Sequence, residues 1–176
     1  MKKGVLFFFG VTAFLGFVGS VQAAIININS KSNAINNPVV INFEAGTYDV
    51  VPIGVADGGG YNAWSACNGH SNTWVHRYCF SSSEFGGACI GGTGSGPYSA
   101  TEMDAFNTAI STSFTLTSGA DVNFYVWDGP NGYEYARDNV GGVSLDVSAV
   151  PIPSALWLLS SGLMGIIGIG RKLKKS

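Results

Sequence analysis

The segment Val143-Ser144-Leu145-Asp146-Val147, near the end of the chain, decides the fold class. Its three aliphatic residues alternate with a serine and an aspartate, which is the two-residue period of a β-strand with one buried and one wet face. The same alternation occurs in Val122-Asn123-Phe124-Tyr125-Val126, and Phe114-Thr115-Leu116 shows it over a shorter length. These segments predict several short strands in antiparallel sheets.

Further strands are expected earlier in the chain. Val39–Phe43 and Gly46–Val51 are rich in β-branched and aromatic residues, and the turn-prone link between them predicts a hairpin. Thr73–Phe80 is expected to be a strand within residues 52–97, a Gly-, Ser- and Asn-rich region that otherwise has the composition of loops. Residues 25–38 are expected to form an extended lead-in, with an edge strand as the alternative. The whole pattern predicts a mainly β domain, a small antiparallel β-sandwich of jelly-roll-like form.

One short helix is expected within this domain. Ser99-Ala100-Thr101-Glu102 has the spacing of a capping box, in which a serine hydroxyl and a glutamate carboxylate satisfy free amides of the first turn. Met103, Phe106 and Ile110 follow at spacings of three and four residues. This spacing predicts a helix of about ten residues with one apolar face.

The two ends of the chain predict export. Residues 1–23 have the basic start, the apolar run and the small residues of a signal peptide, with cleavage after Ala23. Residues 24–149 then form the exported domain, and residues 150–176 form a C-terminal signal. In that signal an uncharged run, 154–170, is long enough to span a bilayer as a helix. The basic residues that follow it, and that stop transfer across the membrane, are Arg171, Lys172, Lys174 and Lys175.

The exported domain is acidic. Between residues 24 and 149 three basic residues stand against all eleven acidic residues of the chain, a net charge of −8. Such a field repels phosphate backbones, so nucleic acid is excluded as a partner. The remaining basic residues flank the two apolar runs, where the positive-inside rule places them.

The C-terminal stretch also has a recognisable order of parts. It opens with the motif Val150, Pro151, Ile152, Pro153, continues through Trp157 and Ser161-Gly162-Leu163, and ends in the basic cluster. In this order it resembles the PEP-CTERM family of sorting signals of Gram-negative bacteria, in the VPxPA-type branch. The resemblance implies a precursor anchored in the inner membrane and processed by signal peptidase and an exosortase-like enzyme. The domain would then pass to the cell surface or to an extracellular exopolysaccharide matrix. A permanently membrane-anchored periplasmic protein is the alternative.

The exported domain itself is similar to the small β-rich domains that precede such tails. The segments that carry this likeness are 45–50, 61–64, 122–126 and 138–145. The likeness implies no activity for any residue.

The three cysteines of the exported chain are expected to form a disulfide, because the compartment is oxidising. Cys79 pairs with either Cys67 or Cys89, and the odd count leaves one thiol free or bonded to another chain. Cys67 with His70, and His76 with Cys79, also have the spacing and ligand types of a zinc site. Since oxidation is favoured, we expect no metal and no cofactor.

Aromatic residues in or beside loops are the candidate binding residues. They are Tyr61, Trp64, Trp74 and Trp127, whose rings can stack on sugars or can fill the core and its rim. We expect a non-enzymatic structural or glycan-binding role. The alternative is an exported polysaccharide hydrolase with paired carboxylates, drawn from Glu84, Glu102, Glu134 and several aspartates.

Overall fold

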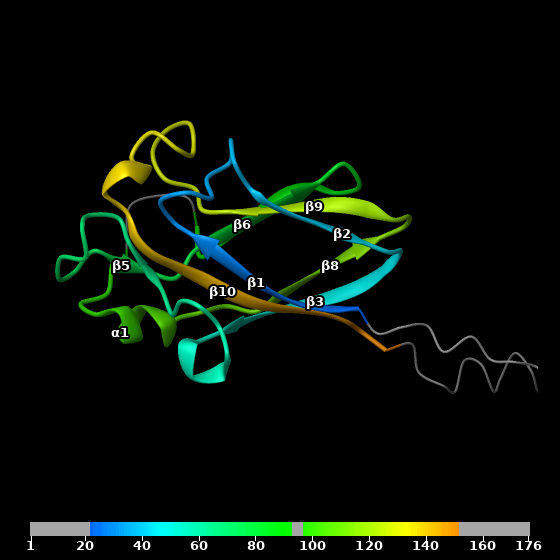
Figure 1. Cartoon of the computed structure of the whole chain (residues 1–176), viewed down its shortest axis with the longest axis horizontal. Coiled ribbons are helices and arrows are strands. Elements are labelled where there is room, and N and C mark those ends of the chain that lie inside the picture. The colour runs from blue at the N-terminus through cyan, green and yellow to red at the C-terminus, as the bar shows by residue number, and fades with distance from the viewer. Residues whose placement is uncertain (1–21, 93–96, 152–176) are drawn as a thin grey trace, which may run out of the picture.

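The computed structural model describes residues 22–92 and 97–151. Within these ranges the protein is mainly β, with antiparallel sheets and a short helix (Figure 1). The expected signal peptide up to residue 21, the motif residues Ile152 and Pro153, the apolar run 154–170 and the basic cluster lie outside the described residues. In the described ranges, no helix has the length and apolar character needed to cross a bilayer.

The strands and helices follow one another in short pieces. They are β1 (Ala23–Asn29), β2 (Val39–Phe43), β3 (Gly46–Ile53), η1 (Val55–Asp57), β4 (Trp64–Ser65), β5 (Trp74–Val75), β6 (Tyr78–Ser82), β7 (Gly86–Ile90), α1 (Glu102–Phe106), β8 (Thr112–Leu116), β9 (Ala120–Tyr125), η2 (Ala136–Asp138) and β10 (Val140–Ala149). Within the described residues these strands form two sheets. One has the order β5-β4-β10-β3-β8, with β1 also on β10, and the other has the order β2-β9-β6-β7.

Strand β10 contains the decisive alternation and organises the larger sheet. Leu145 lies opposite Ile26 of β1 and Pro52 of β3 in antiparallel register. Val143, Leu145 and Val147 are buried without exposed surface. The alternation therefore predicted the buried face of this strand correctly. Ser144, expected on the wet face, is buried as well, and its hydroxyl accepts hydrogen bonds from the amides of Gly60 and Tyr61.

The inner faces of the two sheets share one core. Phe43 of β2 packs against Tyr48 of β3 and Phe114 of β8, with ring centroids 4.8 and 5.6 Å apart. Phe124 of β9 joins this group at 6.3 Å from Phe43. Because rings from both sheets meet here, burial of aromatic surface holds the sheets together.

The predicted hairpin of β2 and β3 is wrong. β2 pairs with β9 in the smaller sheet, whereas β3 pairs with β10 and β8 in the larger one. The link between them therefore crosses from sheet to sheet. The Tyr48 hydroxyl donates to the carbonyl oxygen of Glu44 at 3.1 Å, and crossing lets Phe43 and Tyr48 bury their rings against each other in the shared core.

The expected strand Thr73–Phe80 is divided between the sheets. β5 belongs to the larger sheet and β6 to the smaller one, with His76 and Arg77 between them. The carbonyl oxygen of Arg77 accepts a hydrogen bond from the Trp64 indole at 3.0 Å and so is used outside any strand ladder. The Gly-rich segment of β7, expected to be loop, is a strand paired with β6.

The helix is shorter than expected and begins elsewhere. α1 has five residues, and its N-cap is Thr101, whose Oγ1 accepts from the backbone amide of Asp104 at 3.2 Å. Ser99 is held extended by two backbone hydrogen bonds to Trp74, so it does not cap the helix. Met103 and Ile110 are 51% and 54% exposed, which contradicts the predicted apolar face.

The ends of β10 lie at opposite ends of the molecule (Figure 1). At its end, Ser148 lies opposite Ala23, so β1 starts where β10 finishes. At its start, Val140 lies opposite Ser65 of β4, beside the loops that follow β9. The candidate site lies at this second end.

Candidate functional site

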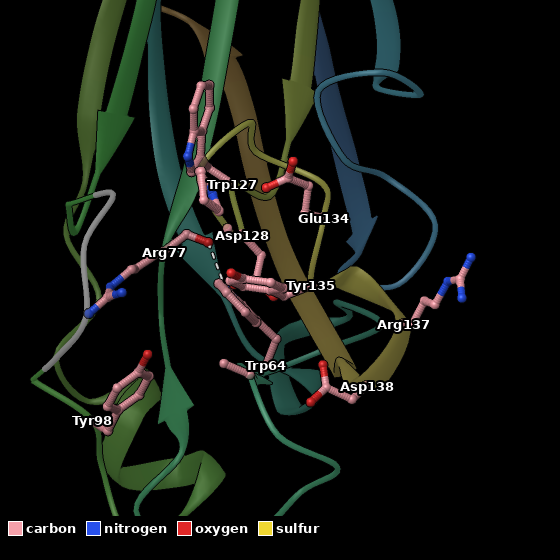
Figure 2. Close-up of a pocket in the computed structure, with 12 residues that line it drawn as sticks. Trp64, Arg77, Tyr98, Trp127, Asp128, Glu134, Tyr135, Arg137 and Asp138 are labelled. Atoms are coloured by element: carbon pink, nitrogen blue, oxygen red, sulfur yellow. Dashed lines mark hydrogen bonds between the residues drawn. The ribbon is translucent and has the colours of Figure 1, made fainter.

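A cleft of about 900 Å³ lies where the loop between β9 and β10 faces β4. Its wall combines aromatic rings with charged groups. The lining residues are Trp64, Ala66, Arg77, Tyr98, Trp127, Asp128, Gly129, Pro130, Glu134, Tyr135, Arg137 and Asp138 (Figure 2).

The loop between β9 and β10 supplies most of the lining, because it turns back on itself. Gly132 has a φ of +83°, and a Cβ there would lie 2.9 Å from the Trp127 ring, so the indole packs on this glycine. Pro130 and Asn131 complete a turn in which the Gly132 amide donates to the carbonyl oxygen of Gly129. The turn brings Trp127 and Tyr135 to the same cleft.

Trp64 forms part of the cleft wall but offers little surface to a ligand. It is 1% exposed, and its Nε1 donates to the carbonyl oxygen of Arg77 at 3.0 Å. Arg77 is also buried, and its Cζ lies 5.5 Å from the centroid of the Tyr98 ring. These residues fix the wall of the cleft through a hydrogen bond and a cation–π contact.

The accessible rings belong to Trp127, which is half-buried, and to Tyr135 and Tyr98, which are exposed. Sequence reasoning identified Trp127 and missed the two tyrosines. Tyr135 follows a turn rich in Asp, Asn and Gly, and this position beside a turn is the sequence feature that could have identified it as an accessible ring. Tyr98 had no comparable signal in the sequence.

The other two aromatic candidates lie outside the cleft lining. Tyr61 accepts a hydrogen bond from Asn29 Nδ2 at 3.0 Å, and its ring packs beside Gly142. Trp74 is held in β5 opposite Ser65. The structure therefore brings Trp64 and Trp127 together and assigns Tyr61 and Trp74 to packing and pairing.

Three carboxylates line the cleft: Asp128, Glu134 and Asp138. Asp128 Oδ2 is buried and has no hydrogen-bond partner among the described residues. Burial raises the pKa of Asp128, the side-chain amide of Asn139 opposes this rise, and repulsion from Asp138 adds to it. The cleft thus presents hydrogen-bond acceptors and negative charge beside open aromatic rings.

The other two glutamates proposed for a carboxylate pair lie elsewhere. Glu84 is exposed and accepts hydrogen bonds from Thr117 and Ser118, which lower its pKa. Glu102 accepts from the backbone amide of Asn62 at 3.4 Å rather than from its own cap. Of the three candidate glutamates, Glu134 is the one at the cleft.

The structure shows which of the two possible cysteine pairings forms. Cys79 and Cys89 form a disulfide, and Cys67 is a free, half-buried thiol. With Cys79 in the disulfide, the four-residue zinc set is not available. Within residues 22–92 and 97–151, no three or more His, Cys, Asp or Glu side chains gather closely enough to hold a metal ion.

No protein-family model, curated protein or solved structure matches this chain. The class is therefore defined by the residues themselves. Over the described residues it is a mainly β protein with two antiparallel sheets, a cross-strand disulfide, and an aromatic and acidic cleft at one end.

Proposed function

We propose that this chain is an exported protein of the cell surface or extracellular matrix that binds glycan in the cleft and has no catalytic role. The cleft carries this proposal, because rings of Trp127, Tyr135 and Tyr98 line it together with three carboxylates. A sugar ring has an apolar face of C–H groups and an edge of hydroxyls. Aromatic faces match the first, and carboxylate oxygens accept hydrogen bonds from the second.

Delivery by a signal peptide and a PEP-CTERM-type sorting tail is part of the same proposal. The arrangement of the chain ends supports it, since Ala23 lies opposite Ser148 and the Val150 amide donates to the carbonyl oxygen of Thr47. The signal peptide and the sorting tail would therefore attach to the domain side by side. β10 has 10 residues, and at about 3.3 Å per residue it would hold the cleft about 30 Å from that end, facing away from the membrane.

We also infer that the two sheets form a jelly-roll-like sandwich. The support is that the first three strands alternate between the sheets: β1 belongs to the larger, β2 to the smaller and β3 again to the larger. β8 and β9, later in the chain, are divided in the same way, with β8 in the larger sheet and β9 in the smaller one. An experimental structure with the same strand order would test this assignment.

Glycan binding is tested by titrating polysaccharide from the native matrix into the purified chain and following tryptophan fluorescence and heat. We expect Tyr135→Ala to weaken binding about tenfold, because it removes an exposed ring face from the cleft. Tyr133→Ala is the matched control, since Tyr133 is 44% exposed in the same loop and is not part of the cleft lining. An absence of binding, or equal losses in both variants, would contradict the proposal.

Sorting is tested by the intact mass of the protein isolated from its native host. We expect loss of the chain from near Val150 onward, together with loss of residues up to Ala23. A mature protein that retains Ser176 would instead support the permanently anchored periplasmic alternative.

Polysaccharide hydrolysis is the second candidate, and the pairing of Asp128 with Asp138 in one cleft favours it. A carboxyl group with a raised pKa can act as a general acid beside an ionised carboxylate. Release of reducing ends from matrix polysaccharide, lost in Asp128→Asn, would establish this activity. Unchanged polysaccharide after prolonged incubation would exclude it for that substrate.

A further inference from the structure

We infer that the cleft selects glycans with free ammonium groups, such as glucosamine polymers that lack N-acetyl groups. This inference rests on the proposed glycan-binding function and adds the chemical class of the ligand. It follows from the charges that face the cleft, from a buried carboxylate oxygen without a donor, and from the position of the rings.

The charge that faces a ligand is negative although the lining contains two arginines. Figure 2 shows the side chain of Arg137 extending away from the other labelled residues. The guanidinium of Arg77 lies over the Tyr98 ring, on the side of the cleft away from Asp138, and although it attracts Asp128 it is one positive charge against three carboxylates. The carboxylates of Asp128, Glu134 and Asp138 therefore dominate the field where a glycan would lie.

Within the described residues, Asp128 is the one of these carboxylates with a buried oxygen that lacks a hydrogen-bond donor. Its Oδ2 is buried and has no hydrogen-bond partner among the described residues, which is costly for a carboxylate. Asp128 lines the cleft, so its carboxylate borders the space where a ligand would lie. A ligand ammonium would supply the missing donor in a charge-assisted hydrogen bond and would offset the repulsion from Asp138.

The aromatic rings favour the same ligand. Trp127 directly precedes Asp128, and Tyr135 lies across the turn from it in the same lining. The faces of such rings attract cations as well as the apolar faces of sugars. Uronate polymers are negatively charged. The carboxylates of the cleft, in a domain whose net charge is −8, repel them, so the cleft discriminates against such polymers.

The test compares three hexasaccharides on the purified full chain by calorimetry in mildly acidic, low-salt buffer: a β-1,4-linked glucosamine hexamer, its fully N-acetylated form and a glucuronate hexamer. We expect the glucosamine hexamer to bind about tenfold more tightly than the acetylated form, and its advantage to shrink as salt is added. The glucuronate hexamer should bind most weakly.

Asp128→Asn keeps the shape of the side chain and removes its charge, so it should reduce the preference for the amine to about twofold or less. Asp138→Asn provides a second variant at the same cleft with the same expected direction. Asp49→Asn is the control, because Asp49 is exposed on β3 opposite Ser148, at the other end of β10. It should leave the preference unchanged.

The outcomes separate the two proposals. Equal binding of the amine and acetylated hexamers would overturn the amine selectivity and leave glycan binding intact. Tighter binding of the glucuronate hexamer would also overturn it. If none of the three hexamers and no matrix polysaccharide binds, the proposed function fails as well.

Discussion

The indole Nε1 of Trp64 donates a hydrogen bond to the backbone carbonyl oxygen of Arg77, with 3.0 Å between the two atoms. Trp64 comes from β4, and Arg77 lies in the link between β5 and β6, where the chain passes from the larger sheet to the smaller. This single bond therefore ties the two sheets together at the wall of the cleft.

Replacing Trp64 by Phe tests the importance of that bond. Phe retains most of the buried ring but removes the indole hydrogen bond to the Arg77 carbonyl, so we expect the free energy of unfolding to fall by about 2 kcal/mol. Urea denaturation followed by circular dichroism measures this change. Glycan affinity should also fall, because the wall loses its fixed position. Unchanged stability would show that water replaces the indole without cost.

The disulfide should stabilise the smaller sheet. Cys79 and Cys89 face each other across β6 and β7, ten positions apart in sequence, and closing so short a loop contributes about 2 to 3 kcal/mol. We expect the double variant Cys79→Ala/Cys89→Ala to lose about that much, and thiol titration of the unfolded, unreduced wild type to find one thiol per chain, Cys67. Cys67→Ala is the control, with a smaller effect. Two or more reactive thiols before reduction would contradict the pairing.

The parts of the fold that could be predicted are those with a local pattern. Val122 and Phe124 in β9, and the three aliphatic residues of β10, alternate with polar residues because each strand has one face on the core. Such a pattern shows that a strand exists without showing which strand it pairs with. The predicted hairpin of β2 and β3 failed for this reason, since partners of a strand depend on residues far away in sequence.

Segments without a pattern were missed for a related reason. β7 reads Gly86-Gly87-Ala88-Cys89-Ile90, with few of the residues that favour strands. It is a strand because β6 lies beside it and a disulfide joins the two. The helix was overestimated because Met103 and Ile110 have helical spacing, while the bridge between Ser99 and Trp74 sets where a helix can begin.

The cleft could be predicted only in part. Trp127 was a candidate because it is an aromatic residue beside a loop, where its ring can stack on a sugar. Tyr98 and Tyr135 lie far apart in sequence and line one cleft because the loops around β4 and β10 lie at one end of the molecule. Composition does not contain that information.

Gly142 illustrates a glycine that the packing requires. A Cβ at this position would overlap the carbonyl oxygen of Ile28 and would lie 2.7 Å from the Tyr61 ring. We expect Gly142→Ala to lower the free energy of unfolding by about 1 to 3 kcal/mol, because strand β1 or the Tyr61 ring must move. Gly87→Ala is the matched control in β7, where the nearest atom would be 3.5 Å away. Equal denaturation midpoints for both variants would contradict this reading of the packing.

His76 should make stability depend on pH. Its ring is buried against Tyr78 and Phe106, and neither ring nitrogen has a hydrogen-bond partner among the described residues. Burial lowers the pKa of His76 from 6.5 to about 4. Between these values the unfolded chain binds a proton that the folded chain does not bind. The contribution of neutral His76 to the free energy of unfolding is therefore complete above about pH 6.5. It falls as the pH drops toward 4, by about 3 kcal/mol in all.

Because carboxyl groups titrate in part of the same range, the contribution of His76 is obtained by comparison with His76→Phe. Phe fills the same space between Tyr78 and Phe106 and cannot take up a proton, so the unfolding free energy of this variant should decline less steeply between pH 6.5 and 4. His70→Asn is the control for removing a histidine, since His70 is exposed. A His76→Phe profile parallel to that of the wild type would mean that the folded protein binds a proton at His76 as readily as the unfolded chain does. A water or ion beside the imidazole would then stabilise its charge.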